Sequence, residues 1–183
     1  MPTTTGRRVL CLAAAVLLAS GLAGCSSSSK DKGSFPTALP STDSTSTLSK
    51  TDFLARMNAV CSAIDAQRKA LPTPAGLTDY PNIAANLSGT LRILPAYLTQ
   101  AEVLVRRSAD KAELTSKWIA VEQSDFATIK PIAERMVADS TAKDEAKVSE
   151  DGEELSTVPD HSSTIADYLT GYGLTSCASL ERD

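Results

Sequence analysis

Five side chains in this sequence could form covalent bonds or bind a metal ion through sulfur or imidazole. They are four cysteines and one histidine: Cys11, Cys25, Cys61, Cys177 and His161. A thiol can take a lipid or acyl group, join a second cysteine in a disulfide, or bind a metal ion as the thiolate. Which of these reactions each cysteine undergoes depends on the compartment that it reaches. The segment before Cys25 gives the first indication of that compartment.

The segment before Cys25 has the pattern of an export signal. Arg7 and Arg8 form a basic start, no acidic residue precedes Cys25, and an apolar run extends from residue 9 to residue 22. A helix that spans a membrane needs about 20 apolar residues, so this run is short for a span. A charged start, a short apolar core and a small-residue end are typical of a secretory signal. We therefore predict that residues 1–24 are removed on export.

The four residues Leu22-Ala23-Gly24-Cys25 resemble the lipobox of bacterial lipoproteins at every position. The resemblance implies that the Cys25 thiol is joined to diacylglycerol, that a peptidase then cuts before Cys25, and that the new amino group takes a fatty acid such as palmitate. The implied product is a lipoprotein held on the extracytoplasmic face of the cell membrane by the lipid on Cys25. The alternative is an ordinary secretory signal in which Cys25 stands by chance.

Export would leave two cysteines in the mature domain. Cys11 leaves with the signal and Cys25 carries lipid, so Cys61 and Cys177 remain as an even pair in an oxidising compartment. Such a pair favours one disulfide. The alternative is a metal site with His161, but these three ligands fall short of the four that structural zinc takes. We therefore predict a Cys61–Cys177 disulfide, no metal site and no cofactor.

The sequence contains no recognisable catalytic constellation. His161 lies between Asp160 and Ser162 in a polar stretch, and a Ser–His–acid triad would need partners that meet only in the fold. No nucleophile-elbow motif is present, so the simpler interpretation is an exposed loop histidine. The acidic run at residues 150–154 lacks the spaced oxygen ligands of an EF-hand loop. We therefore predict no catalytic residue and no enzymatic activity.

Residues 25–51 are predicted to be a flexible, lipidated linker. Residues 26–51 hold nine serines and five threonines together with Pro36, Pro40 and Gly33, and almost no apolar residues. A chain of this composition does not bury enough apolar surface to fold. The folded domain is therefore expected to span residues 52–183.

The charge of the chain argues against negatively charged partners. The sequence has 18 basic and 22 acidic residues, and removing Arg7 and Arg8 leaves 16 against 22, a net charge of −6. Residues 139–160 alone hold eight acids against Lys143 and Lys147. A surface of this sign repels phosphate, which argues against nucleic acid or an anionic bilayer surface as a partner.

The domain is predicted to be all-α, a small antiparallel bundle of four to five helices. Ser49 and Asp52 form a helix start, with Leu48 and Phe53 placed as a hydrophobic staple. We expect helices over residues 49–71, 79–105, 110–136, 142–155 and 162–170, the fourth interrupted by Gly152 and the last stopped by Gly171 and Gly173. Apolar residues at three- and four-residue steps define the first three: Phe53, Met57, Val60, Cys61, Ile64 and Leu71; Ile83, Leu87, Leu91, Leu94, Leu98, Ala101 and Val105; Leu114, Trp118, Val121, Phe126, Ile129, Ala133 and Met136.

Two prolines fall inside the predicted second and third helices. Because the apolar stripes continue through Pro95 and Pro131, we interpret both as kinks within helices and not as helix ends. One hypothesis is that the kinks open an apolar groove between the two helices. The alternative is that they curve the helices around the core. The residues expected to line such a groove are Leu91, Leu94, Leu98, Ile129 and Ala133.

The two ends of the domain resemble those of small, uncharacterised helical lipoproteins of actinobacteria. The segments are Asp52-Phe53-Leu54-Ala55-Arg56-Met57-Asn58-Ala59-Val60-Cys61 and Tyr172-Gly173-Leu174-Thr175-Ser176-Cys177. The resemblance implies a helical bundle with one disulfide and supplies no activity. We therefore expect a membrane-anchored, non-catalytic binding or scaffolding module with an envelope protein as partner. The alternative function is a carrier of a small apolar or lipid-like ligand.

Overall fold

The computed structural model describes residues 46–182. Within these residues the chain is helical and contains no strand, so the predicted all-α class is confirmed. The signal, Cys25 and most of the linker lie outside the described residues. The elements in order are α1 (Lys50–Lys69), α2 (Tyr80–Val105), α3 (Lys111–Leu114), the π-helical turn η2 (Thr115–Ile119), α4 (Ala120–Ala142), α5 (Glu145–Thr157), α6 (Ser162–Tyr172) and α7 (Thr175–Arg182).

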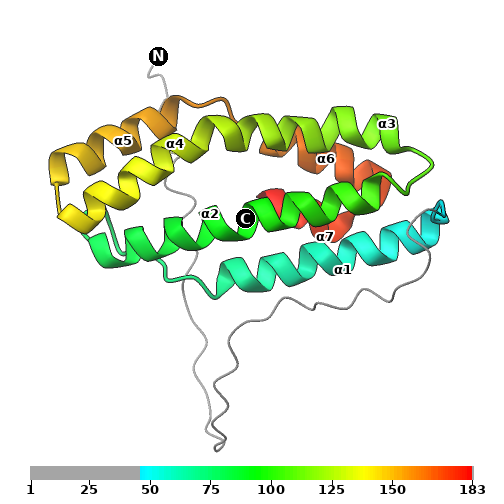
Figure 1. The fold of residues 1–183 in the computed structure, drawn as a ribbon, viewed down its shortest axis with the longest axis horizontal. Helices are drawn as coiled ribbons and strands as arrows, with labels where there is room; N and C mark the ends of the chain where they lie inside the picture. Colours follow the sequence, from blue (N-terminus) through cyan, green and yellow to red (C-terminus); the bar gives the residue numbers. More distant parts are fainter. Residues whose placement is uncertain (1–45, 183) are drawn as a thin grey trace, which may run out of the picture.

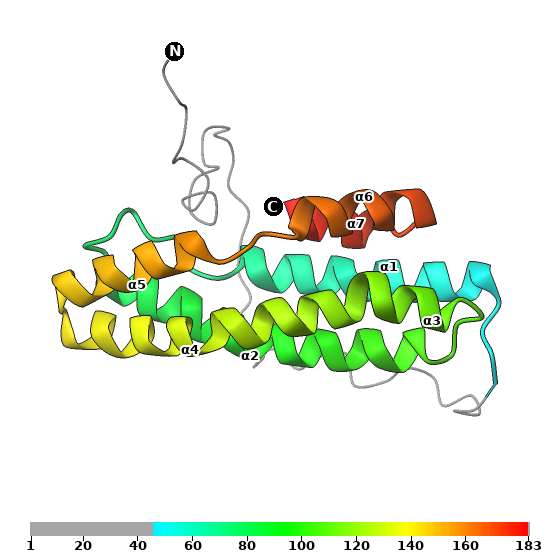
Figure 2. The ribbon, with the colours of Figure 1, turned by 90° about the horizontal axis from the view of Figure 1, so that it is seen from above.

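Three long rods form the body of the bundle (Figure 1). They are α1, α2 and the unbroken run of α3, η2 and α4, and each runs antiparallel to the one before it. Helix α5 folds back along the second half of α4. Helices α6 and α7 pack on each other, with α7 against α1 and α6 against η2 (Figure 2). The chain thus brings its last helix back onto its first.

Helix α1 begins where the sequence predicts. The Ser49 hydroxyl accepts a hydrogen bond from the Asp52 backbone N–H at 3.1 Å and donates one to the Asp52 carboxylate at 2.6 Å. Leu48 is buried in the same core cluster as Phe53, as the predicted staple requires. The Leu48 N–H also donates to the Arg107 carbonyl at 2.8 Å. The packed part of the chain therefore includes Leu48, four residues before the expected start of the domain.

In α1 the buried residues follow the predicted apolar stripe, whereas in α2 the buried face differs in part from the predicted one. Phe53, Met57, Val60, Cys61 and Ile64 are buried as predicted, but α1 ends at Lys69, so Leu71, the last residue of the predicted stripe, lies beyond the helix and is half-buried. In α2, by contrast, Leu91 and Leu94 are only half-buried, because α2 packs against both α1 and α4 and its buried face is centred elsewhere. That face is formed by Ile93, Tyr97, Leu98, Ala101, Leu104 and Val105.

Of the interruptions predicted at glycines, only the one at Gly173 is observed. Helices α2 and α4 continue through Pro95 and Pro131, as predicted, and both prolines are exposed. The expected break at Gly152 is wrong, because α5 runs through it, and Gly171 likewise lies inside α6. Both of these glycines keep backbone N–H groups that can donate within a helix. Gly173 does end α6, because it has the left-handed φ of 100° that favours glycine.

The segment after Gly173 forms a further helix that was not among the helices predicted from the sequence. Helix α7 starts with the Ala178 N–H donating to the Leu174 carbonyl at 2.9 Å. Its buried side chains, Cys177, Ala178 and Leu180, point into the main core. The helix has eight residues, too short to show a repeating apolar stripe. With α7, the described residues hold six helices when the continuous run of α3, η2 and α4 is taken as one.

Candidate functional site

The disulfide predicted from the sequence joins the first and last helices. Cys61 on α1 is bonded to Cys177 on α7, with 4.9 Å between their Cα atoms, and both are fully buried. Asn58, one turn before Cys61, binds the same region twice. Its side-chain amide donates to the Gly173 carbonyl at 3.3 Å, and its side-chain oxygen accepts from the Ser176 N–H at 2.9 Å. The start of α7 is therefore held on α1 by one covalent and two polar contacts.

A cluster of buried polar side chains lies beside the disulfide. The Tyr97 hydroxyl is 3.8 Å from the Cys61 Sγ, and the Tyr97 ring packs against Trp118 with 6.5 Å between centroids. The Trp118 indole N–H donates a hydrogen bond to the carboxyl group of Glu122. Glu181 on α7, which is half-buried, is close enough to act electrostatically on Glu122. We call Tyr97, Trp118 and Glu122 the buried polar cluster.

Burial shifts the pKa of the carboxyl groups of Glu122 and Glu181 in the same direction. Glu122 is only 8% exposed, and burial raises the pKa of its carboxyl group well above the usual range, with the nearby Glu181 adding to the shift. Burial also raises the pKa of Glu181, while the hydrogen bond from Glu122 and the positive charge of Arg68 oppose that rise.

The buried polar cluster was not predicted from the sequence. Glu122 looks like an ordinary charged residue of a surface helix, and Glu181 falls in a segment that was not predicted to be helical. One local signal was present: Trp118 and Glu122 are four residues apart, so a helix places them on the same face. That face is the one that carries the apolar stripe, which indicates that Glu122 lies at its buried edge.

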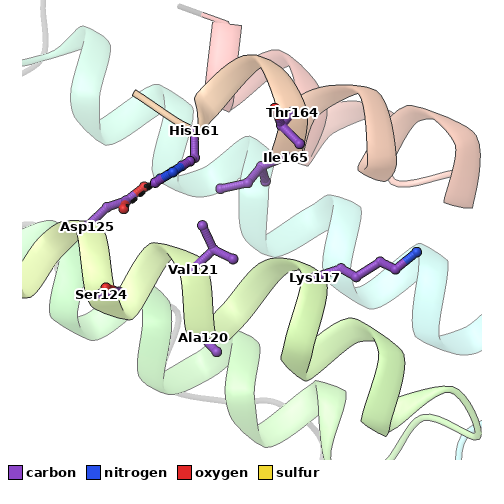
Figure 3. Close-up of a pocket in the computed structure, with 8 residues that line it drawn as sticks. All are labelled: Lys117, Ala120, Val121, Ser124, Asp125, His161, Thr164 and Ile165. Atoms are coloured by element: carbon purple, nitrogen blue, oxygen red, sulfur yellow. Dashed lines mark hydrogen bonds and ion pairs between the residues drawn. The ribbon is translucent and has the colours of Figure 1, made fainter. Parts of the chain in front are cut away.

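A shallow hollow of about 380 Å³ lies between η2 and α4 on one side and α6 on the other. Figure 3 shows Val121 and Ile165 facing each other across it, with the His161 ring turned toward Asp125. The remaining lining residues are Lys117, Ala120, Ser124 and Thr164.

His161 is exposed, as predicted, but it has a partner that the sequence did not indicate. Its Nδ1 lies 2.9 and 3.0 Å from the two carboxylate oxygens of Asp125 on α4. In the described part of the chain, the hydrogen bonds of this ring run to Asp125 and none runs to a hydroxyl group. The pair therefore joins the loop before α6 to α4, and it lacks the hydroxyl nucleophile of a catalytic triad.

The five residues predicted to line an apolar groove differ in how deeply they are buried. Leu98 and Ala133 are buried in the bundle, Leu91 and Leu94 are half-buried, and Ile129 is exposed. Helices α2 and α4 are packed neighbours, as the hypothesis requires. None of the five residues lines the hollow between α4 and α6.

The predicted lipidation site, Cys25, lies outside the described residues. Among residues 46–182, no helix combines the length and the apolar character needed to cross a membrane, and no three His, Cys, Asp or Glu side chains gather as they would around a metal ion. Comparisons with protein-family models, with curated proteins and with solved structures found no match to this chain.

Proposed function

We propose that this protein is a lipoprotein anchored through Cys25 on the extracytoplasmic face of the cell membrane, where its helical domain acts as a non-catalytic binding or scaffolding module. The observation that carries the proposal is the buried Cys61–Cys177 disulfide. Disulfides of this kind persist in exported proteins and are rare in a reducing cytoplasm. Export is also what the basic start, the apolar run and Leu22-Ala23-Gly24-Cys25 indicate.

The arrangement of the polar side chains supports a module over an enzyme. The Trp118 indole N–H donates to Glu122 inside the bundle, so these two polar groups are engaged with each other. His161 and Asp125 engage each other in the same way at the surface. An active site instead needs a nucleophile, a base and a space for the reacting group within reach of one another.

A carrier of a lipid-like ligand has weaker support. Such a protein needs an apolar cavity that covers most of its ligand. Leu98 and Ala133, two of the expected lining residues, are packed within the bundle. The hollow beside His161 is open to solvent and not an enclosed cavity, so it would leave much of an acyl chain uncovered.

The anchor can be tested by Cys25→Ser. Because the proposed lipid acceptor is the Cys25 thiol, this variant should carry no diacylglycerol and should keep its signal segment. Mass spectrometry of the N-terminal peptide from the membrane fraction measures both effects. Cys11→Ser is the matched control, since it removes a thiol from the same signal and should leave lipidation and cleavage intact. A wild-type protein with an unmodified Cys25, or one cut at another bond, would contradict the proposal.

Native mass spectrometry separates the module from the carrier. We expect the domain to be purified without a bound small molecule and to be recovered with a protein partner after cross-linking in intact cells. A lipid-like molecule that stays bound through purification would instead support the carrier.

A further inference from the structure

Helix α5 contributes no residue to the main core of the bundle. Its Val148 is fully buried in a second, smaller cluster, against Ile83 of α2 and Met136 of α4. Leu155, two turns further along α5, is half-buried and packs on the same cluster. Figure 1 shows α5 lying along the second half of α4, at the opposite end of the bundle from α3. Helix α5 therefore covers an apolar surface, and we call the residues that form it the covered surface: Tyr80, Ile83 and Leu87 of α2 and Met136 of α4.

The polar contacts between α5 and α4 are incomplete. Asp151, on the buried face of α5, is 5% exposed, and its Oδ1 accepts a hydrogen bond from the Arg135 Nε at 3.1 Å. Its Oδ2 has no hydrogen-bond partner within residues 46–182, and neither has the buried hydroxyl group of Ser140 on α4. A buried polar atom without a partner costs stability, because it loses its hydration and gains nothing in return. The docking of α5 is therefore weaker than its apolar contacts alone would make it.

The backbone of α5 adds to this weakness. Gly152 lies in the middle of the helix, where glycine is less favourable than alanine. Lys143, in the turn that joins α4 to α5, has a left-handed φ of 58°, which side chains other than glycine rarely adopt. A helix of 13 residues with a central glycine does not persist alone in water. Helix α5 therefore stays helical only while it is docked.

We propose that the covered surface is the docking site for an amphipathic helix of a partner protein, and that α5 occupies this site until the partner helix displaces it. The inference rests on the proposed function of the domain as a binding module. A helix laid on an apolar surface is a common mode of protein recognition. Here the domain supplies the first such helix from its own chain, so the site is closed when no partner is present.

The side chains of α5 define the chemistry that the partner helix needs. Val148 and Leu155 are seven residues apart, so they lie on one face of the helix. Asp151 lies between them and binds Arg135, which also binds Glu154. The partner helix should therefore carry two apolar side chains seven residues apart with an acidic side chain between them. It displaces α5 when it has the higher helix propensity, because it then loses less free energy on docking.

Hydrogen exchange of the full chain, purified in detergent, tests whether α5 opens by itself. We expect the amides of α5 to exchange at least about tenfold faster than those of α1, each relative to its unstructured-chain rate, because opening of α5 leaves the main core intact. If α5 and α1 exchange equally fast, α5 opens only when the whole domain unfolds, and the proposal is overturned.

Two glycine variants show whether the opening depends on the helix propensity of α5. Gly152→Ala should slow the exchange of α5 by about fivefold, because alanine favours the helix and its Cβ would meet no neighbouring atom within 4 Å. Gly171→Ala is the matched control in α6, where an added Cβ likewise has open space, and it should leave α5 unchanged. An equal effect of both variants on α5 would contradict a local opening.

A peptide tests whether the covered surface accepts a helix from another molecule. The probe is a fluorescent peptide with the sequence of residues 144–158 and the change Gly152→Ala, and its binding to the full chain is followed by anisotropy. Val148→Ala in the full chain weakens the docking of α5 and leaves Ile83 and Met136 intact. We expect this variant to bind the peptide at least about tenfold more tightly than the wild type does. A peptide that also carries Val148→Ser and Leu155→Ser is the control and should not bind.

The outcomes separate this inference from the proposed function. If the full chain with Val148→Ala does not bind the peptide, or binds the control peptide equally well, the covered surface is not a docking site, although the module can still bind a partner elsewhere. Failure of the proposed function has a different signature, since no protein partner would then be cross-linked in intact cells, whatever the peptide does.

Discussion

Replacing both Cys61 and Cys177 by alanine should lower the free energy of unfolding by about 4–5 kcal/mol. The two cysteines are separated by 116 residues, so the disulfide closes almost the whole described domain into one loop. In the chain-entropy account, a loop of this length removes a large number of conformations from the unfolded chain, and that restriction is what stabilises the fold. The sulfur atoms are also fully buried, so the alanines would leave a small cavity.

Urea unfolding followed by circular dichroism measures this loss of stability. Ser62→Ala is the matched control, because Ser62 is the exposed neighbour of Cys61 on the same helix; it should change stability by less than about 0.5 kcal/mol. The two Asn58 hydrogen bonds to the Gly173 carbonyl and the Ser176 N–H remain in the double variant. If the double variant lost only about 1 kcal/mol, these contacts and the core would be holding α7 without the disulfide.

The long helices could be predicted because their signals are local. In α1, a capping serine and apolar residues at three- and four-residue steps specify both the start and the buried face. The disulfide was predictable by counting, since export leaves two cysteines with one pairing between them. Helix α7 shows neither kind of signal. The segment is helical because its few apolar side chains pack into the core of the bundle, and this packing stabilises the helix.

The paired polar side chains could not be predicted, because each pair joins distant parts of the chain. Nothing in the residues around Glu122 indicates that the carboxyl group of Glu181 will lie near it. Likewise, nothing near His161 indicates Asp125, so the sequence predicted the exposure of the histidine and not its partner. Both arrangements depend on where α6 and α7 lie relative to α4. That position is determined by packing in the core and not by any short sequence motif.

The largest single-residue effect is expected at Trp118, the biggest of the fully buried side chains. Trp118→Ala should lower the free energy of unfolding by about 3–5 kcal/mol, through lost burial and the cavity that remains. The measurement is thermal or urea unfolding followed by circular dichroism, because Trp118 is the only tryptophan and the variant loses its fluorescence. Lys117→Ala, one residue away and exposed, is the control and should change little. A loss below about 1 kcal/mol for Trp118→Ala would mean that the core collapses into the space left by the indole.

Trp118→Phe separates the indole hydrogen bond from the bulk of the ring. Phenylalanine fills most of the space but removes the N–H that donates to Glu122, which should cost about 1–3 kcal/mol because a buried oxygen loses its partner. That donor favours the charged carboxylate, so its removal should also raise the pKa of the Glu122 carboxyl group further. A Trp118→Phe variant as stable as the wild type would show that the indole hydrogen bond adds nothing to the stability of the core.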